Sequence, residues 1–145
     1  MANQDSFALE RFVAAQAGVI DRVLDELRAG RKQSHWMWFV FPQLAGLGRS
    51  PTAVHYAIAS LDEARAFLAH PVLGQRLRAC TQLVLDVEDK SAHAIFGSPD
   101  DLKFRSSMTL FAAAAPSEPI FGAALKKYFA GAGDDATIEA LRRLG

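Results

Sequence analysis

The sequence predicts an all-α fold, a single compact domain (residues 1–145) of about eight short-to-medium helices. Three observations predict it. Apolar residues recur at intervals of three and four along most of the chain, which is the spacing of one helical face. Helix-start signals built on serine and proline separate these segments. The one aromatic-rich run has no second candidate strand with which it could pair.

The first element is expected to be a helix from Leu9 to Leu27. Asp5 or Ser6 can cap its start, and Gly30 can end it. Its apolar face consists of Leu9, Phe12, Val13, Val19, Ile20, Val23, Leu24 and Leu27, with a gap at Gln16.

The next segment, His35 to Phe41, is apolar on every side from Trp36 onward, and Pro42 stops it. Such a run is typical either of a buried strand or of a buried helix, because periodicity does not separate the two. We expect a short helix, since no partner strand is present in the sequence.

A loop is expected over 43–49, where Gly46 and Gly48 lie, and Ser50 followed by Pro51 opens a helix. Later helices are expected over 61–69, 71–87, 91–96, 98–115, 119–130 and 135–144. The connections between these elements are short, which favours one compact domain.

Composition and charge exclude several classes of protein. The chain carries 16 basic and 16 acidic residues and no basic arm, so nucleic acid is an improbable partner. No apolar run is long enough to span a bilayer, and the first residues lack the pattern of a signal peptide. Cys80 is the only cysteine, and we expect a buried, inert thiol. These features favour a cytoplasmic protein.

No motif indicates a metal site or a cofactor, and we expect neither. The four histidines show no pair four residues apart, and Gly46-Leu47-Gly48 lacks the third glycine of a dinucleotide fingerprint. No reaction is indicated either, so whether the protein is an enzyme stays open.

The stretch between Leu27 and Leu61 contains no Asp or Glu, yet it holds four basic residues and both tryptophans. A glycine-bearing loop leads there into a helix start, which suits an anion. We therefore expect residues 32–56 to build a pocket for a small phosphate- or carboxylate-bearing ligand. Nucleotide-like ligands belong to this class. The residues expected to bind it are Lys32, Trp36, Trp38, Gly46, Gly48, Arg49, Ser50, Tyr56, Lys103 and Ser107.

If the pocket is catalytic, His35 or His55 would transfer the proton, because histidine titrates near neutral pH. The same residues also have a purely structural interpretation, in which the glycines form a turn, Ser50 caps a helix and the tryptophans belong to the core. A different class of function is a protein-interaction or homodimerisation module that uses exposed aromatic side chains.

A stretch running from Ser34-His35-Trp36-Met37-Trp38-Phe39 through Gly46-Leu47-Gly48-Arg49-Ser50 resembles a bacterial family catalogued as domain of unknown function 1810. The resemblance continues at His70-Pro71-Val72-Leu73-Gly74 and at Ser106-Ser107-Met108-Thr109-Leu110-Phe111, so it covers nearly the whole chain. It implies a small, mostly helical cytoplasmic protein and supplies no catalytic residues. The calpastatin-like label sometimes attached to the family does not fit a chain this apolar.

Overall fold

The computed structural model describes residues 7–144, so the two expected capping residues Asp5 and Ser6 lie outside the described part. Within it the chain forms ten helices and no named strand, which confirms the all-α prediction. The helices are α1 (Glu10–Ala17), α2 (Ile20–Arg28), α3 (Met37–Val40), α4 (Pro51–His55), α5 (Leu61–Ala69), α6 (Leu73–Asp86), α7 (Ala92–Phe96), α8 (Asp100–Ala114), α9 (Pro119–Phe129) and α10 (Asp135–Leu144).

The single helix predicted over residues 9–27 is two helices in the structure. The chain breaks at Gly18 and Val19, and Val19 has φ −129°, outside the helical region. The change of direction lets α1 pack on α3 while α2 packs on α6. Gln16, the gap in the apolar pattern, is buried here, and its amide nitrogen donates to the carbonyl of Phe39 at 2.7 Å.

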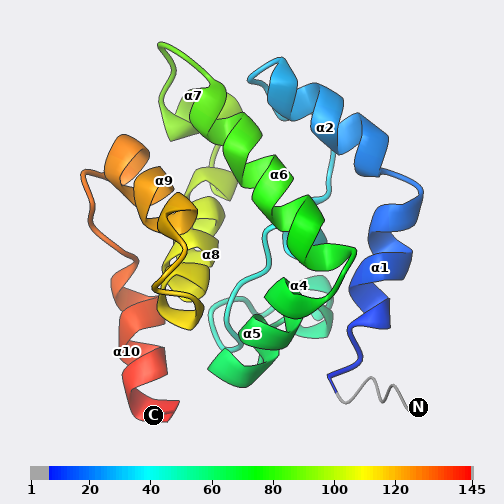
Figure 1. Cartoon of the computed structure of the whole chain (residues 1–145), viewed down its shortest axis with the longest axis vertical. Coiled ribbons are helices and arrows are strands. Elements are labelled where there is room, and N and C mark those ends of the chain that lie inside the picture. The colour runs from blue at the N-terminus through cyan, green and yellow to red at the C-terminus, as the bar shows by residue number, and fades with distance from the viewer. Residues whose placement is uncertain (1–6, 145) are drawn as a thin grey trace.

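Helix α8 is the centre of the packing, because α3, α5, α7, α9 and α10 all contact it. Figure 1 shows α6 crossing the face of the molecule between α2 and α9. The C-terminal helix α10 packs against α8. Two aromatic side chains of α8 contact aromatic residues of the segments around it. Phe104 lies against Phe41 and Phe96, and Phe111 lies against Phe67.

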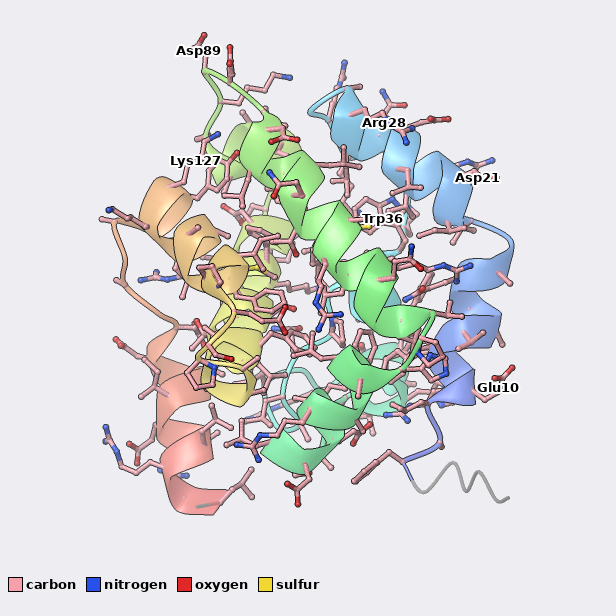
Figure 2. The ribbon with its side chains drawn as sticks, viewed as in Figure 1. Glu10, Asp21, Arg28, Trp36, Asp89 and Lys127 are labelled. Carbon is pink, nitrogen blue, oxygen red and sulfur yellow. The ribbon has the colours of Figure 1, made fainter. Side chains whose placement is uncertain are left out.

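The aromatic run forms the short helix α3, as predicted, and most of it is core. Trp36 is only 1% exposed, and Figure 2 shows it in the interior behind α6. After the helix, the chain is fastened to residue 58 by a single parallel bridge. The Ile58 N–H donates to the Gln43 carbonyl at 2.9 Å, and the Ala45 N–H donates to the Ile58 carbonyl at 2.8 Å. These bonds fix the loop over 43–50 in place.

A second clamp, built on Arg11, holds the far end of this loop region. Its guanidinium is 2.9 Å from the carboxylate of Glu63 and also donates to the carbonyls of His55 and Ala57. The other carboxylate oxygen of Glu63 accepts from the Ala59 N–H at 2.9 Å. Because both charged groups are largely buried, this clamp ties α1 to the segment that joins α4 and α5.

The entry to the aromatic run is held by the carboxylate of Glu26. It accepts hydrogen bonds from the N–H groups of Gln33 and Ser34, from the Ser34 hydroxyl and from the Trp36 indole at 2.6–3.0 Å. Burial raises the pKa of Glu26, but these hydrogen bonds outweigh burial and lower the pKa from 4.5 to about 2.

The depressed pKa of Glu26 predicts a pH dependence of stability. Because the folded-state pKa lies below the unfolded one, the stabilisation is complete above about pH 4.5 and is lost as the pH falls towards 2. We expect the difference in unfolding free energy between wild type and Glu26→Gln to shrink steadily over this window. Urea denaturation at several pH values would measure it, and a difference that stays constant between pH 6 and 3 would contradict the assignment.

Candidate functional site

The candidate site is a cleft of about 410 Å³ where three parts of the chain meet. They are the segment from Trp38 to Ala53, the first half of α8, and the start of α10. The lining residues are Trp38, Gln43, Leu47, Gly48, Arg49, Ser50, Ala53, Pro99, Leu102, Lys103, Ser106, Asp134 and Ala136. A volume of this size is in the usual range for small-molecule sites.

The two glycines of the loop have structural explanations. Gly46 has φ +96°, a left-handed conformation that glycine adopts without strain. At Gly48 a Cβ atom would come within 2.6 Å of the Ala53 Cβ, so glycine is needed for the loop to close on α4. Gly48 lines the cleft, whereas Gly46 does not.

Arg49 and Ser50 form the rim of the cleft beside this loop. The Ser50 hydroxyl accepts from the Ala53 N–H at 3.1 Å and caps α4, as predicted. Its role is therefore at least partly structural. Arg49 is exposed, and within residues 7–144 its guanidinium has no ion-pair or hydrogen-bond partner. This cation is available to a ligand.

Lys103 reaches the same cleft from α8. Its ammonium lies 4.9 Å from the centroid of the Trp38 ring and 3.5 Å from a carboxylate oxygen of Asp100. The other oxygen of Asp100 is 2.8 Å from the ammonium of Lys32, whose side chain is only 6% exposed. One carboxylate thus serves two lysines, and this trio keeps a net positive charge.

The positive charge of the acid-free stretch of sequence is therefore partly balanced by a carboxylate in the fold. Asp100 neutralises Lys32, which also donates to the Ser34 carbonyl at 2.6 Å and takes no part in the cleft. Of the two basic residues within 32–56, Lys32 is thus paired with a carboxylate from α8 that the acid-free sequence did not reveal, and it does not bind in the cleft as expected. The cations that remain at the cleft are Arg49 and Lys103.

Several other predicted site residues lie outside the cleft. Trp36 is in the core with its indole N–H on Glu26, and Tyr56 packs against Phe12 and Phe39 beside a small inner cavity. Ser107 is completely buried, and its hydroxyl has no hydrogen-bond partner among the described residues.

The two histidines singled out as proton-transfer candidates are both exposed, and neither lines the cleft. His55 ends α4 with its ring edge against Tyr56. The geometry therefore gives His35 and His55 no common site with Arg49 and Lys103.

Three polar residues of the cleft, Gln43, Ser106 and Asp134, were not anticipated. The Ser106 hydroxyl donates to the Leu102 carbonyl within α8. Gln43 has a side-chain amide with no hydrogen-bond partner in the part of the chain that the structure describes. Asp134 caps α10, because its Oδ2 accepts from the N–H and hydroxyl of Thr137 at 2.9 and 2.7 Å. The adjacent pair Asp134-Asp135 is typical of a helix start in the sequence, and nothing there placed Asp134 in one cleft with Arg49.

A family model described as a protein of unknown function (DUF1810) matches residues 6–141 of the chain. The chain belongs to this family. No curated protein matches the chain. This DUF1810 chain is similar to the crystal structure of the conserved hypothetical protein Rv1873 from Mycobacterium tuberculosis, with a TM-score of 0.94 and 57% sequence identity. That match covers 95% of this chain and 99% of the other. The relative is itself described as hypothetical, so it supports the fold and brings no activity to this DUF1810 member.

A second cleft of about 500 Å³ adjoins the first in this DUF1810 chain and shares Leu47 and Ala136 with it. Small apolar side chains line most of it, including Ala45, Ala59 and Ala140. It offers few groups that could orient a ligand, so the polar cleft is the better candidate site.

Other chemical features of the DUF1810 chain add no further centre. Residues 7–144 hold no group of three or more His, Cys, Asp or Glu side chains that could bind a metal. None of the described helices combines the length and the apolarity needed to cross a membrane. Cys80 is buried, as predicted, and burial raises the pKa of its thiol to about 12, although Arg76 opposes the shift. Such a thiol is unreactive at neutral pH.

Proposed function

We propose that this DUF1810 domain binds a small anionic ligand, one with a phosphate or carboxylate group and a planar ring, in the cleft lined by Trp38, Arg49 and Lys103. The observation that carries the proposal is the convergence of two cations and an indole on one cleft from segments far apart in the sequence. An arginine binds a phosphate or carboxylate through two parallel hydrogen bonds, and an indole offers a flat apolar surface to a ring.

The state of the side chains in this cleft supports binding. Buried or half-buried polar groups in a folded protein are normally paired with one another. Here the half-buried side chain of Gln43 has no hydrogen-bond partner within residues 7–144, and it shares the cleft with the exposed, unpaired guanidinium of Arg49. The ammonium of Lys103 is held over the Trp38 ring, so an arriving anion meets a cation already in position. A cytoplasmic location in a bacterial cell is part of the proposal, because a chain with a single cysteine suits a reducing compartment.

The alternative function, association through exposed aromatic residues, has less support. The large hydrophobic side chains exposed within residues 7–144 are Val54, Leu102, Ile138 and Leu144, and none of them is aromatic. The aromatic surface on which a homodimer or partner-binding module was expected to rest is therefore largely core.

Arg49→Ala tests the proposal. We expect isothermal titration calorimetry to detect binding of AMP or CMP by the wild type, and binding about tenfold weaker or worse by Arg49→Ala, because a charge-assisted pair is lost. Arg31→Ala is the matched control, since Arg31 belongs to the same basic stretch, is exposed and lies outside the cleft. The affinity of Arg31→Ala for the nucleotides should equal that of the wild type.

Inorganic phosphate, titrated alone, tells whether the anion is sufficient or the ring is needed. The proposal fails if neither nucleotide nor phosphate binds the wild type with a Kd below about 1 mM. It fails equally if Arg49→Ala binds as tightly as the wild type.

A further inference from the structure

The wall of the cleft contributed by the start of α10 carries a negative group, which an anion site would not need. Asp134 lines the cleft together with Arg49 and Lys103. The cap of α10 uses only one of its two carboxylate oxygens, since Oδ2 accepts both hydrogen bonds from Thr137. Within residues 7–144 the other oxygen, Oδ1, has no hydrogen-bond partner.

The backbone of Asp134 is fixed independently of its side chain. Its N–H donates to the Thr109 hydroxyl at 2.9 Å, and that hydroxyl in turn donates to the Arg105 carbonyl of α8 at 2.8 Å. The neighbouring Gly133 lies so close to Thr109 that a Cβ there would come within 3.2 Å of its side chain. The start of α10 is therefore anchored on α8, and the Asp134 carboxylate that caps α10 is held in a set position at the cleft.

We propose that Asp134 selects, among planar anionic ligands of this cleft, those that carry an amino group, and that the preferred class is a nucleotide with an exocyclic amine such as a cytosine or adenine base. This inference rests on the proposed function. A carboxylate oxygen only accepts hydrogen bonds, so it binds an amino group and repels the carbonyl oxygen that replaces it in uracil or hypoxanthine.

The three kinds of group in the cleft match the three parts of such a ligand. Arg49 and Lys103 suit the phosphate, Trp38 suits the planar base, and Asp134 suits the amine at its edge. Gln43, which lines the same cleft, both donates and accepts hydrogen bonds, so it tolerates either type of base and does not weaken the discrimination.

Matched nucleotide pairs test the inference. We expect the wild type to bind CMP about tenfold more tightly than UMP, and AMP about tenfold more tightly than IMP, by calorimetry. In Asp134→Asn the carbonyl oxygen can still cap α10 while the amide N–H₂ faces the cleft, so the preference should vanish or reverse towards UMP and IMP. Asp135→Asn, an exposed neighbour outside the cleft, should keep the wild-type preference.

The failures of the two proposals are distinguishable. If CMP and UMP bind the wild type equally, or if Asp134→Asn keeps the preference for CMP, the selectivity of Asp134 is refuted while anion binding stands. If neither the four nucleotides nor inorganic phosphate binds, the proposed function itself is refuted. Binding of phosphate without any of the nucleotides refutes only the preference for an amino-bearing base. Should Asp134→Asn unfold, the wild-type comparison of both pairs still decides, because equal affinities within each pair overturn the inference.

Discussion

Replacing Glu26 by alanine is expected to lower the free energy of unfolding by about 3 kcal/mol at neutral pH. The carboxylate accepts four hydrogen bonds, one of them from the fully buried indole of Trp36. Its removal leaves the buried Trp36 indole N–H without a partner, and an unsatisfied buried donor costs more than a hydrogen bond contributes. Urea denaturation followed by circular dichroism would measure the change.

Two further variants show whether the charge or only the shape of Glu26 matters. Glu26→Gln keeps one acceptor oxygen and should lose roughly half as much stability as the alanine variant. Glu88→Ala removes an exposed carboxylate and should change stability by less than about 0.5 kcal/mol. If Glu26→Ala were no less stable than Glu88→Ala, the four hydrogen bonds of Glu26 would not be what keeps the aromatic run in the core.

Helix boundaries that depend on local chemistry could be predicted from the sequence. Ser50, Ser60 and Ser91 all accept a hydrogen bond from the backbone N–H three residues later, as the capping pattern predicts. Each of these bonds joins neighbours in sequence, so the pattern contains all the information needed. The helices expected over 61–69 and 135–144 begin where expected, because Ser60 and Asp134 cap them with bonds of the same local kind.

The break between α1 and α2 could not be predicted in the same way. Apolar residues continue at helical spacing across Gly18 and Val19, so the pattern indicates one helix. The break accompanies tertiary contacts that join residues far apart in sequence, such as the hydrogen bond from Gln16 to the Phe39 carbonyl and the separate packing of α1 on α3 and α2 on α6.

The residues of the candidate site also fall into those that a local pattern predicts and those that tertiary packing brings together. Gly48, Arg49 and Ser50 are consecutive, and their grouping was visible in the sequence. The pairing of Lys32 with Asp100 and the arrival of Asp134 at the cleft depend on how α8 and α10 pack, which no local pattern encodes. Trp36 and Trp38 show the limit most clearly, because two residues of one type, two positions apart, end in the core and in the cleft respectively.

Gly74→Ala is expected to destabilise the protein by about 3 kcal/mol or more, although alanine is the better helix former. Gly74 lies in the first turn of α6, where a Cβ would come within 2.0 Å of the Leu68 carbonyl oxygen at the end of α5. That neighbour is backbone inside a helix, so it cannot move aside as a side chain would. The two helices would have to separate, and Leu73 and Leu77, both buried, would lose packing.

Gly122→Ala is the matched control because Gly122 also lies inside a helix, α9, but apart from the backbone of α9 itself nothing lies within 4 Å of the added Cβ. There the helix propensity of alanine acts alone, and we expect a gain of roughly 0.5–1 kcal/mol. Thermal denaturation of the two variants should therefore shift Tm in opposite directions. Equal shifts would mean that α5 and α6 approach less closely than the structure shows. Opposite shifts would show that the close approach of α5 and α6 requires glycine at position 74, since helix propensity alone favours alanine at both sites.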